Sequence, residues 1–252
     1  MIFIAALILA MPILAYCIGA FPTGLVVVRQ LKGIDIRTIG SGNIGATNVK
    51  RVLGTGWFVI VLVLDAAKAA GAVLLARFFY SLITTNPMLQ SLFSIDAVPV
   101  EHIYIIVIAA CVILGNMFNV FLEFNGGKGI GHALGILFAL TPLPVLVCLS
   151  LFIAIVALSR YLSLGSLAAT TAYPFIVFFL PGLTPHISTT DIMPYLLFAV
   201  VLSTIVILKH IANIQRLVSG TENTFSLFSA KRKKKKPSRL KIKTKKRKTK
   251  RK

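Results

Sequence analysis

Six long apolar runs determine what kind of fold this chain can adopt. They cover residues 2–28, 57–80, 102–122, 131–158, 162–181 and 192–209. A helix needs about 20 predominantly apolar residues to cross the hydrocarbon core of a bilayer. Only 13% of the 252 residues are charged, which is too few to cover the surface of a soluble domain of this length. The sequence therefore predicts an all-α polytopic membrane protein.

The positions of the basic residues predict the sidedness of the chain. Lys and Arg cluster in the connection 29–51 and recur at Lys128 and Arg160, whereas the connections 81–101 and 182–191 contain neither residue type. By the positive-inside rule, the basic connections face the cytoplasm and the first residue lies outside. The first run lacks a basic leader and is too long for a signal peptide, so we expect it to remain as a span.

Six crossings do not satisfy this rule, because Arg160 and the basic C-terminus would then lie outside. Thr141-Pro142-Leu143-Pro144 lies near the middle of the run 131–158, and two prolines at i and i+2 end a helix. Dividing the run there gives two short segments of about 12 and 15 residues, below the ~20 of a full crossing. We therefore predict a seven-helix transmembrane bundle with its N-terminus outside and its C-terminus inside.

Most of the formal charge of +20 belongs to a C-terminal tail. Residues 231–252 hold 16 of the 27 Lys and Arg, and the rest of the chain has a net charge of only +4. A block of like charges repels itself and stays disordered. We predict one integral membrane domain at 1–230 and a disordered cytoplasmic tail at 231–252 that contacts anionic lipid. No aromatic residue interrupts the basic run, so the tail specifies no nucleic-acid partner.

Three polar islands interrupt the hydrocarbon. The first island is Ser41–Asn48 with Arg51, the second is Asn125–Gly129, and the third runs from His210 to Asn223. A glycine-rich backbone beside cationic side chains can hold a small anion, because main-chain amides and cations converge on it. Hydroxyl and amide side chains in the first island add further donors. The islands therefore predict a site for an anionic substrate at one face of the membrane.

Three familiar motifs are matched in the wrong context. Gly40–Gly45 spells GxGxxG, but no β-strand precedes it and no βαβ unit follows, which argues against a dinucleotide site. The second island lacks the spacer and the hydroxyl residue of a Walker loop. His186 and Asp191 spell HxxxxD, the spacing that the classical acyltransferases use for a His base and the Asp that orients it. Since their connection is assigned to the outside, we interpret that match as chance.

The cysteines and the metal ligands suggest no redox or metal chemistry. Each cysteine stands alone in an apolar run, without CxxC or His spacing around it, so we interpret all three as small buried hydrophobes: Cys17, Cys111 and Cys148.

Two pairs of polar residues have helical i, i+3 spacing. Asp65 and Lys68 lie within the second apolar run, on one face of a helix. Charges within a span face the bundle interior and mark either function or an internal clamp, and both readings stay open here. His210 and Asn213 lie at the inner end of the last run, so they should point into the same cytoplasmic mouth.

The three islands resemble the cytoplasmic motifs of the bacterial acyl-phosphate-dependent glycerol-3-phosphate acyltransferases, the PlsY family. The likeness covers about residues 5–225, and its clearest segments are Ser41–Asn48, Val120–Gly129, Arg160–Ser166, His210–Asn213 and Gly220–Glu222. It implies a seven-helix fold with the N-terminus outside. It also implies transfer of a fatty acyl group from acyl phosphate to the 1-hydroxyl of glycerol 3-phosphate, giving lysophosphatidic acid for phospholipid synthesis. The location implied is the bacterial inner membrane, with the active site facing the cytoplasm. Family members usually carry His, Pro and Arg where this chain has Asn116, Asn119 and Ile211.

The resemblance and the chemistry of the islands together define a candidate site. Ser41, His210 and Asn213 are the expected catalytic residues. The expected substrate- and phosphate-binding residues are Gly42, Asn43, Gly45, Thr47, Asn48, Arg51, Gly127, Lys128, Gly129, Ser166, Arg216 and Glu222.

Acyl phosphate is already an activated anhydride, so the reaction needs positioning and charge stabilisation rather than a covalent enzyme intermediate. No metal and no cofactor are expected. Either His210 or a substrate phosphate oxygen takes the proton of the attacking hydroxyl.

A transporter of an organophosphate or another small anion is the alternative function. Transporters place polar groups near the middle of the membrane and often show inverted repeats. Here the polar groups gather at one face, and only Asp65 and Lys68 lie deeper in a run. The sequence therefore favours the acyltransferase.

Overall fold

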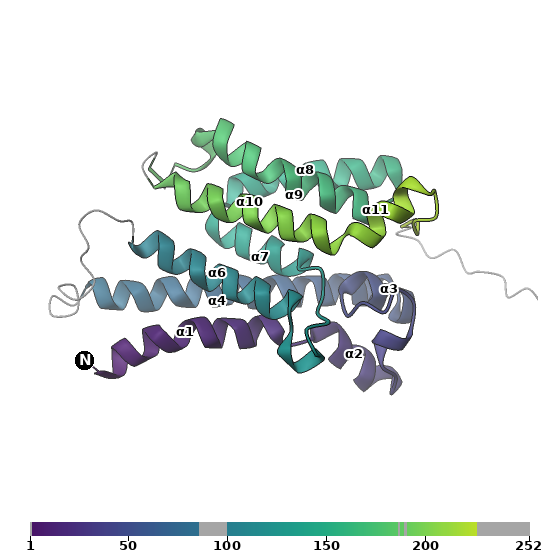
Figure 1. The fold of residues 1–252 in the computed structure, drawn as a ribbon, viewed down its shortest axis with the longest axis horizontal. Coiled ribbons are helices and arrows are strands. Elements are labelled where there is room, and N and C mark those ends of the chain that lie inside the picture. Colours follow the sequence, from purple (N-terminus) through teal and green to yellow (C-terminus); the bar gives the residue numbers. More distant parts are fainter. Residues whose placement is uncertain (1, 86–99, 186, 189–190, 226–252) are drawn as a thin grey trace, which may run out of the picture.

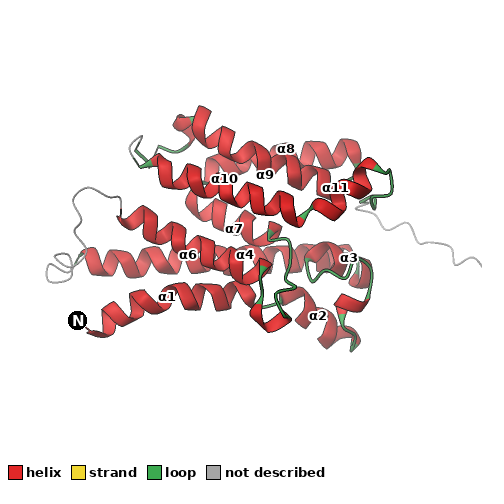
Figure 2. Cartoon of the chain, in the orientation of Figure 1, coloured by secondary structure: helices red, strands yellow, loops and turns green. Residues whose placement is uncertain are grey.

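The computed structural model describes residues 2–85, 100–185, 187–188 and 191–225, and all regular secondary structure within them is helical (Figure 2). The long apolar helices are α1 (Ile2–Ala20), α4 (Thr55–Thr84), α6 (Val100–Met117), α8 (Pro142–Ser159), α9 (Leu162–Phe179) and α10 (Ile192–Lys209). The shorter elements are α2 (Thr23–Lys32), α3 (Ala46–Leu53), α7 (Ile130–Leu140) and α11 (Ile211–Val218), with single turns η1 (Ile36–Thr38), η2 (Val120–Leu122) and η3 (Pro181–Leu183).

The prediction of an all-α integral membrane protein is confirmed. Among the described residues, five helices are long and apolar enough to cross a membrane, or six if α1 and α2 count as one bent span. The first apolar run was expected to form a single helix over 2–28. Instead it bends by 40° at Phe21-Pro22, where α1 ends and α2 begins. Proline lacks an amide hydrogen and clashes with the preceding turn, so the helix breaks there.

The predicted division of the run 131–158 is also confirmed. Helix α7 ends at Leu140 and α8 begins at Pro142, which occupies the first helical position where a missing amide hydrogen costs nothing. The two segments have 11 and 18 residues rather than about 12 and 15. Helix α8 is thus long enough to cross, whereas α7 rises only about 16 Å.

Helix α7 can be short because its N-terminus already lies inside the bundle. A Cβ built on Gly131 would lie 3.1 Å from the Cβ of Asp65, so the first turn of α7 packs beside Asp65 on α4. Asp65 is ten residues beyond Thr55, or about 15 Å along α4. The loop before α7 therefore enters the bundle, and α7 begins beside Asp65 rather than at the end of the bundle.

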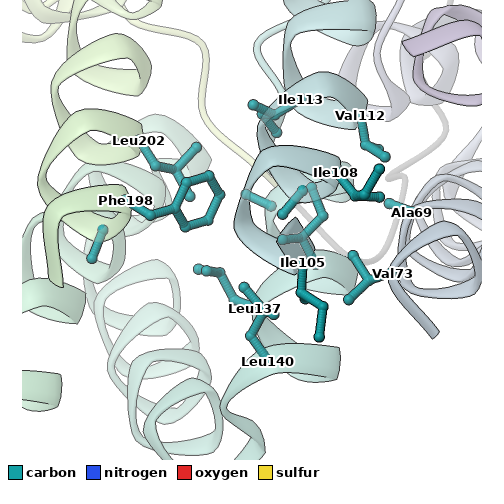
Figure 3. Packing of buried hydrophobic residues seen from close by; sticks show 14 of the residues in the cluster. Ala69, Val73, Ile105, Ile108, Val112, Ile113, Leu137, Leu140, Phe198 and Leu202 are labelled. Atoms are coloured by element: carbon teal, nitrogen blue, oxygen red, sulfur yellow. The ribbon is translucent and has the colours of Figure 1, made fainter. Parts of the chain in front are cut away.

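Apolar side chains from α4, α6, α7 and α10 fill the centre of the bundle. Figure 3 shows this core, in which Val73, Ile108, Leu137 and Phe198 are buried together. Glycines bring the helix axes close: a Cβ on Gly115 of α6 would lie 2.1 Å from the Tyr16 carbonyl oxygen of α1. Small residues at such contacts are how helices associate in lipid, where the hydrophobic effect does not drive them together.

The connections alternate between the two ends of the bundle. One end of the bundle holds the first island, the loop before α7, the start of α9 and helix α11 (Figure 1). The opposite end holds the C-terminus of α4 and the N-terminus of α10. At that opposite end His102 contacts the Tyr195 hydroxyl at 2.8 Å and Asp191 at 3.8 Å. Asp191 is therefore far from the three islands, as the interpretation of the HxxxxD match as chance requires. His186 and the tail 231–252 lie outside the described residues.

We expect the contact between α7 and α4 to be sensitive to a single methyl group. A Cβ on Gly135 would lie 1.9 Å from the Ala66 carbonyl oxygen, so Gly135→Ala must push the two backbones apart. Overpacking of this kind should lower the free energy of unfolding by about 1–3 kcal/mol. Thermal unfolding of the detergent-solubilised protein, followed by circular dichroism, measures this effect.

Gly71→Ala is the matched control. No heavy atom lies within 4 Å of a Cβ built on Gly71, although this residue is also helical and also on α4. The control should be neutral or slightly stabilising, because alanine favours the helix by up to about 1 kcal/mol over glycine. Equal stability of the two variants would contradict the proposed close packing at Gly135.

Candidate active site

The first island is a loop built around the side chain of Asn48, which is fully buried. Its Nδ2 donates to the carbonyl oxygens of Ile36 and Ile39, at 3.1 and 2.9 Å, and its Oδ1 accepts from the Ser41 amide at 3.1 Å. Asn43 closes a second turn by accepting from the Gly45 amide at 2.9 Å. The side-chain amide of Asn48 and the side-chain oxygen of Asn43 thus bond backbone groups of the loop and fix its shape.

Two glycines of this loop have a left-handed backbone that other residues rarely adopt. Gly40 and Gly42 have φ angles of 67° and 69°. A Cβ on Gly40 would also lie 2.2 Å from the Oδ1 of Asn48 and 3.1 Å from the Cδ of Arg51. The loop therefore packs directly on the stem of Arg51.

Three polar groups of the first island are left facing solvent. Ser41 and Thr47 are exposed, and so is Arg51 on α3. No carboxylate among the described residues forms an ion pair with Arg51. An exposed guanidinium without a carboxylate partner is available to bind an oxyanion in a bidentate manner.

The second island is held by the end of α6. The Gly127 amide donates to the Asn116 carbonyl oxygen at 2.9 Å, and a Cβ on Gly126 would lie 1.9 Å from that oxygen. Gly129 precedes α7 with a φ angle of 76°. This tight backbone holds Lys128 between two fixed glycines and directs its side chain to the third island.

Lys128 forms the contact that joins the second and third islands. Its ammonium donates to the Oδ1 of Asn213, which lies 85 residues later in the chain. Burial and the positive charges of Arg216 and Arg51 lower the pKa of Lys128 to about 8, against the opposing effect of Glu222. Lys128 therefore joins the second and third islands, and the charge of Arg51 in the first island also acts on it.

Glu222 organises the third island. Its carboxylate accepts from Asn213 Nδ2 at 2.8 Å, Arg216 Nε at 2.7 Å and Ser163 Oγ at 3.0 Å. Burial opposes ionisation of Glu222, but these hydrogen bonds outweigh burial and hold its pKa below the usual range. The ionised carboxylate thereby fixes the orientation of the Asn213 amide, which leaves Oδ1 to face Lys128.

His210 lies under this network and is only 2% exposed. Its Nδ1 lies 2.8 Å from the Val206 carbonyl oxygen, so Nδ1 carries the proton and Nε2 is the accepting nitrogen. Burial and the charge of Lys128 lower the pKa of His210 to about 4. The imidazole is therefore neutral at neutral pH, with one free lone pair.

The start of α9 contributes a residue that the sequence reasoning missed. Ser166 was expected in the site, but its hydroxyl bonds the Leu162 carbonyl oxygen of its own helix at 2.9 Å. Ser163, one helical turn earlier in the same Arg160–Ser166 segment, is the serine that reaches Glu222. Helical i, i+3 spacing from Ser166 could have identified it.

The segment after Glu222 crosses back to the first island, a contact that the sequence reasoning also missed. The Phe225 amide donates to the Arg160 carbonyl oxygen at 2.6 Å, and the Lys50 ammonium lies 3.3 Å from the centre of the Phe225 ring. The Phe225 ring also packs against the Phe58 ring of α4, with ring centroids 5.5 Å apart. The third island is thus tied to both α3 and the end of α8.

One of the residues that depart from the resembled family, Asn119, has a structural role. Asn119 is fully buried, donates to the Ala20 carbonyl oxygen and accepts from the Phe121 amide at 3.0 Å. It therefore caps η2 and ties this turn to the end of α1. Ile211 is 47% exposed on α11.

Among the described residues, no group of three or more His, Cys, Asp or Glu side chains could hold a metal ion. The site itself is built from polar side chains of the three islands. It combines several cations, one fixed carboxylate, one neutral imidazole and exposed hydroxyls, which is an arrangement that can bind and align anionic groups.

Comparison with known proteins identifies the family. The sequence profile of the family described as "Glycerol-3-phosphate acyltransferase" matches residues 9–220. A protein of this name from Trichlorobacter lovleyi is 42% identical over 212 residues, which is 84% of this chain and 94% of that protein. Another from Nostoc sp. is 38% identical over 213 residues, or 84% and 89% of the two chains.

Two crystal structures of PlsY (YgiH), an integral membrane glycerol 3-phosphate acyltransferase, share the fold. The glycerol 3-phosphate form is 33% identical with a TM-score of 0.69, and the lysophosphatidic acid form is 32% identical with a TM-score of 0.67. Each match covers 87% of this chain and 96% of the other. The chain therefore belongs to the glycerol-3-phosphate acyltransferase family.

Proposed function

We propose that this protein transfers a fatty acyl group to glycerol 3-phosphate and so forms lysophosphatidic acid. The observation that carries the proposal is the contact of Lys128 with Asn213, which joins the second and third islands, on a chain that belongs to this acyltransferase family. A site rich in cations suits a substrate and a product that both carry phosphate. The relatives with crystal structures were obtained with these two molecules.

The acyl donor that fits the site best is acyl phosphate. Its phosphate is a leaving group, so the attacking hydroxyl needs no covalent enzyme intermediate and no metal. The 1-hydroxyl oxygen of glycerol 3-phosphate attacks the acyl carbon, the carbon–oxygen bond to phosphate breaks, and inorganic phosphate departs. Two anions must therefore lie side by side, which explains the need for cations from separate islands.

We assign the phosphate contacts to Arg51, Lys128 and Arg216, with Asn213 turned toward them by Glu222. The exposed hydroxyl of Ser41 and the loop backbone at Gly42–Gly45 orient the donor or the developing oxyanion.

The proton leaves with the departing phosphate. Neutral His210 accepts a hydrogen bond through Nε2, but a group whose pKa is about 4 holds a proton weakly at neutral pH. A phosphate oxygen is the stronger base under these conditions. His210 therefore orients the attacking hydroxyl, and phosphate is the final acceptor.

We infer seven crossings with the N-terminus outside: α1, α4, α6, the short α7, α8, α9 and α10. The support is the alternation of ends in Figure 1, which gathers the basic islands at one end. By the positive-inside rule this end faces the cytoplasm of a bacterial inner membrane, where both substrates are soluble or membrane-associated. The Lys- and Arg-rich sequence of the tail 231–252 suits contact with anionic lipid at this face.

The purified protein, given acyl phosphate and glycerol 3-phosphate, should form lysophosphatidic acid. Lys128→Ala and Arg51→Ala should each lower kcat/KM by roughly 10- to 100-fold, because each removes charge-assisted hydrogen bonds of about 1.5–3 kcal/mol. Product detection by mass spectrometry measures both claims. Ile211→Ala, an exposed change on α11 next to the site, is the control and should keep normal turnover. An inactive wild-type protein would refute the function, and active Lys128 and Arg51 variants would refute the assigned site.

The lowered pKa of Lys128 predicts how kcat/KM depends on pH. Since this pKa is about 8, the ammonium is charged below pH 8 and neutral above it. If the charged form binds phosphate, kcat/KM should fall about tenfold per pH unit above pH 8. Lys128→Arg should remove this alkaline decline, because a guanidinium stays charged throughout the range. An unchanged profile in Lys128→Arg would show that another group titrates.

Sidedness can be tested by labelling single cysteines in intact cells, after the three native cysteines are replaced by alanine. Cysteine at Thr85 should react with an impermeant maleimide added outside, whereas cysteine at Ser219 should react only after the cells are opened. Both positions are exposed, and they lie at opposite ends of the bundle. The reverse pattern would invert the proposed topology.

A further inference from the structure

A buried polar cluster lies between the helices that lead into the first and second islands, and the chemistry proposed above does not use it. Its members are Thr23 of α2, Asp65 and Lys68 of α4, and His132 of α7. Thr23 and His132 are 7% and 1% exposed. Charged groups inside a membrane-spanning helix are costly unless they are partnered, so such a cluster requires an explanation.

The cluster occupies the break between α1 and α2. The Lys68 ammonium donates to the Phe21 carbonyl oxygen at 2.5 Å and to Thr23 Oγ1 at 3.0 Å. It also lies 2.8 Å from Asp65 Oδ1, to which Thr23 Oγ1 donates at 2.7 Å. One ion pair on α4 thus satisfies the polar groups at the break and holds the start of α2 in place.

The same level of α4 also carries α7. Gly131 packs on the Cβ of Asp65, as described above, and His132 is the next residue. The His132 ring interacts with the Gly19 backbone and with the charges of Asp65 and Lys68, and its Nε2 has no hydrogen-bond partner among the described residues. The ring therefore lies at the junction of α1, α4 and α7.

One helix at this junction, α2, packs against the first island, and the other, α7, directly follows the second island. A Cβ on Gly24, the residue after Thr23, would lie 2.1 Å from the Ile44 carbonyl oxygen of the first island. Lys128 lies three residues before Gly131. The turn of α4 between Asp65 and Lys68 thus positions the backbones of both the first and the second island.

We infer that Thr23, Asp65 and Lys68, with His132 beside them, form a positioning clamp that sets Arg51 and Lys128 at the separation needed for two substrate phosphates. This inference rests on the proposed acyltransfer. A misplacement of about 1 Å can cost on the order of 100-fold in rate. Loosening the clamp therefore lowers kcat, while each cation site on its own still binds its phosphate and KM changes little.

Kinetics of the full-length protein test the clamp with matched variants. Lys68→Met should lower kcat at least 30-fold, and Thr23→Val about fivefold, with the KM of each substrate within threefold of the wild-type value. Thr23→Ser keeps the hydroxyl and should stay within twofold in kcat. His102→Gln removes a polar contact at the opposite end of the bundle and should leave kcat unchanged. Thr23→Val is nearly isosteric, so it still tests the clamp if Lys68→Met fails to fold.

Hydrogen–deuterium exchange provides a readout that needs no turnover. In Thr23→Val and Lys68→Met, amides of residues 23–48 and 126–131 should exchange at least tenfold faster, while amides of α8 and α10 keep their wild-type rates. This result would stand even if the wild-type protein failed to acylate glycerol 3-phosphate, so the two proposals fail separately. Unchanged exchange in both islands overturns the clamp, as does faster exchange with wild-type kcat. Faster exchange throughout the bundle also overturns it, because these residues would then support the whole fold.

Discussion

The active site depends on the close approach of α7 to α4. Gly131 and Gly135 let α7 rest against Asp65 and the Ala66 backbone. Lipid tails are as apolar as leucine, so helices in a bilayer associate through such close surfaces and through polar contacts. Because α7 has only 11 residues, its docking point determines how far its N-terminus enters the bundle. Lys128 is carried inward with it and so reaches Asn213.

This placement concentrates positive charge in a half-buried site. Arg51 and Arg216 both lie close enough to Lys128 to lower its pKa, and Glu222 is the carboxylate that offsets them. Glu222 is itself occupied in orienting Asn213 and Arg216. The remaining cations repel one another. Under the function proposed above, a phosphate bound between them would turn that repulsion into attraction.

The sequence predicted the elements of the site better than their contacts. The island boundaries, the break at Pro142 and the pairing of Asp65 with Lys68 follow from local patterns, and the structure agrees with each. Two serines one turn apart look alike until the partner helix is known, and it is the Ser163 hydroxyl, not that of Ser166, that donates to Glu222. Substrate binding by Asn48 stays a prediction, and the structure shows that its side-chain amide bonds three backbone groups of the same loop.

By itself, the sequence determined the class of fold, the ends of most helices and the segments that carry the chemistry. Apolar run length, proline and glycine act over a few residues, so their effects can be inferred locally. Only the tertiary structure decided which distant groups meet, such as Lys128 with Asn213 or Ser163 with Glu222. Those contacts depend on the depth and rotation of each helix against its neighbours. Depth and rotation are set by the summed packing of the whole bundle, which no single segment encodes.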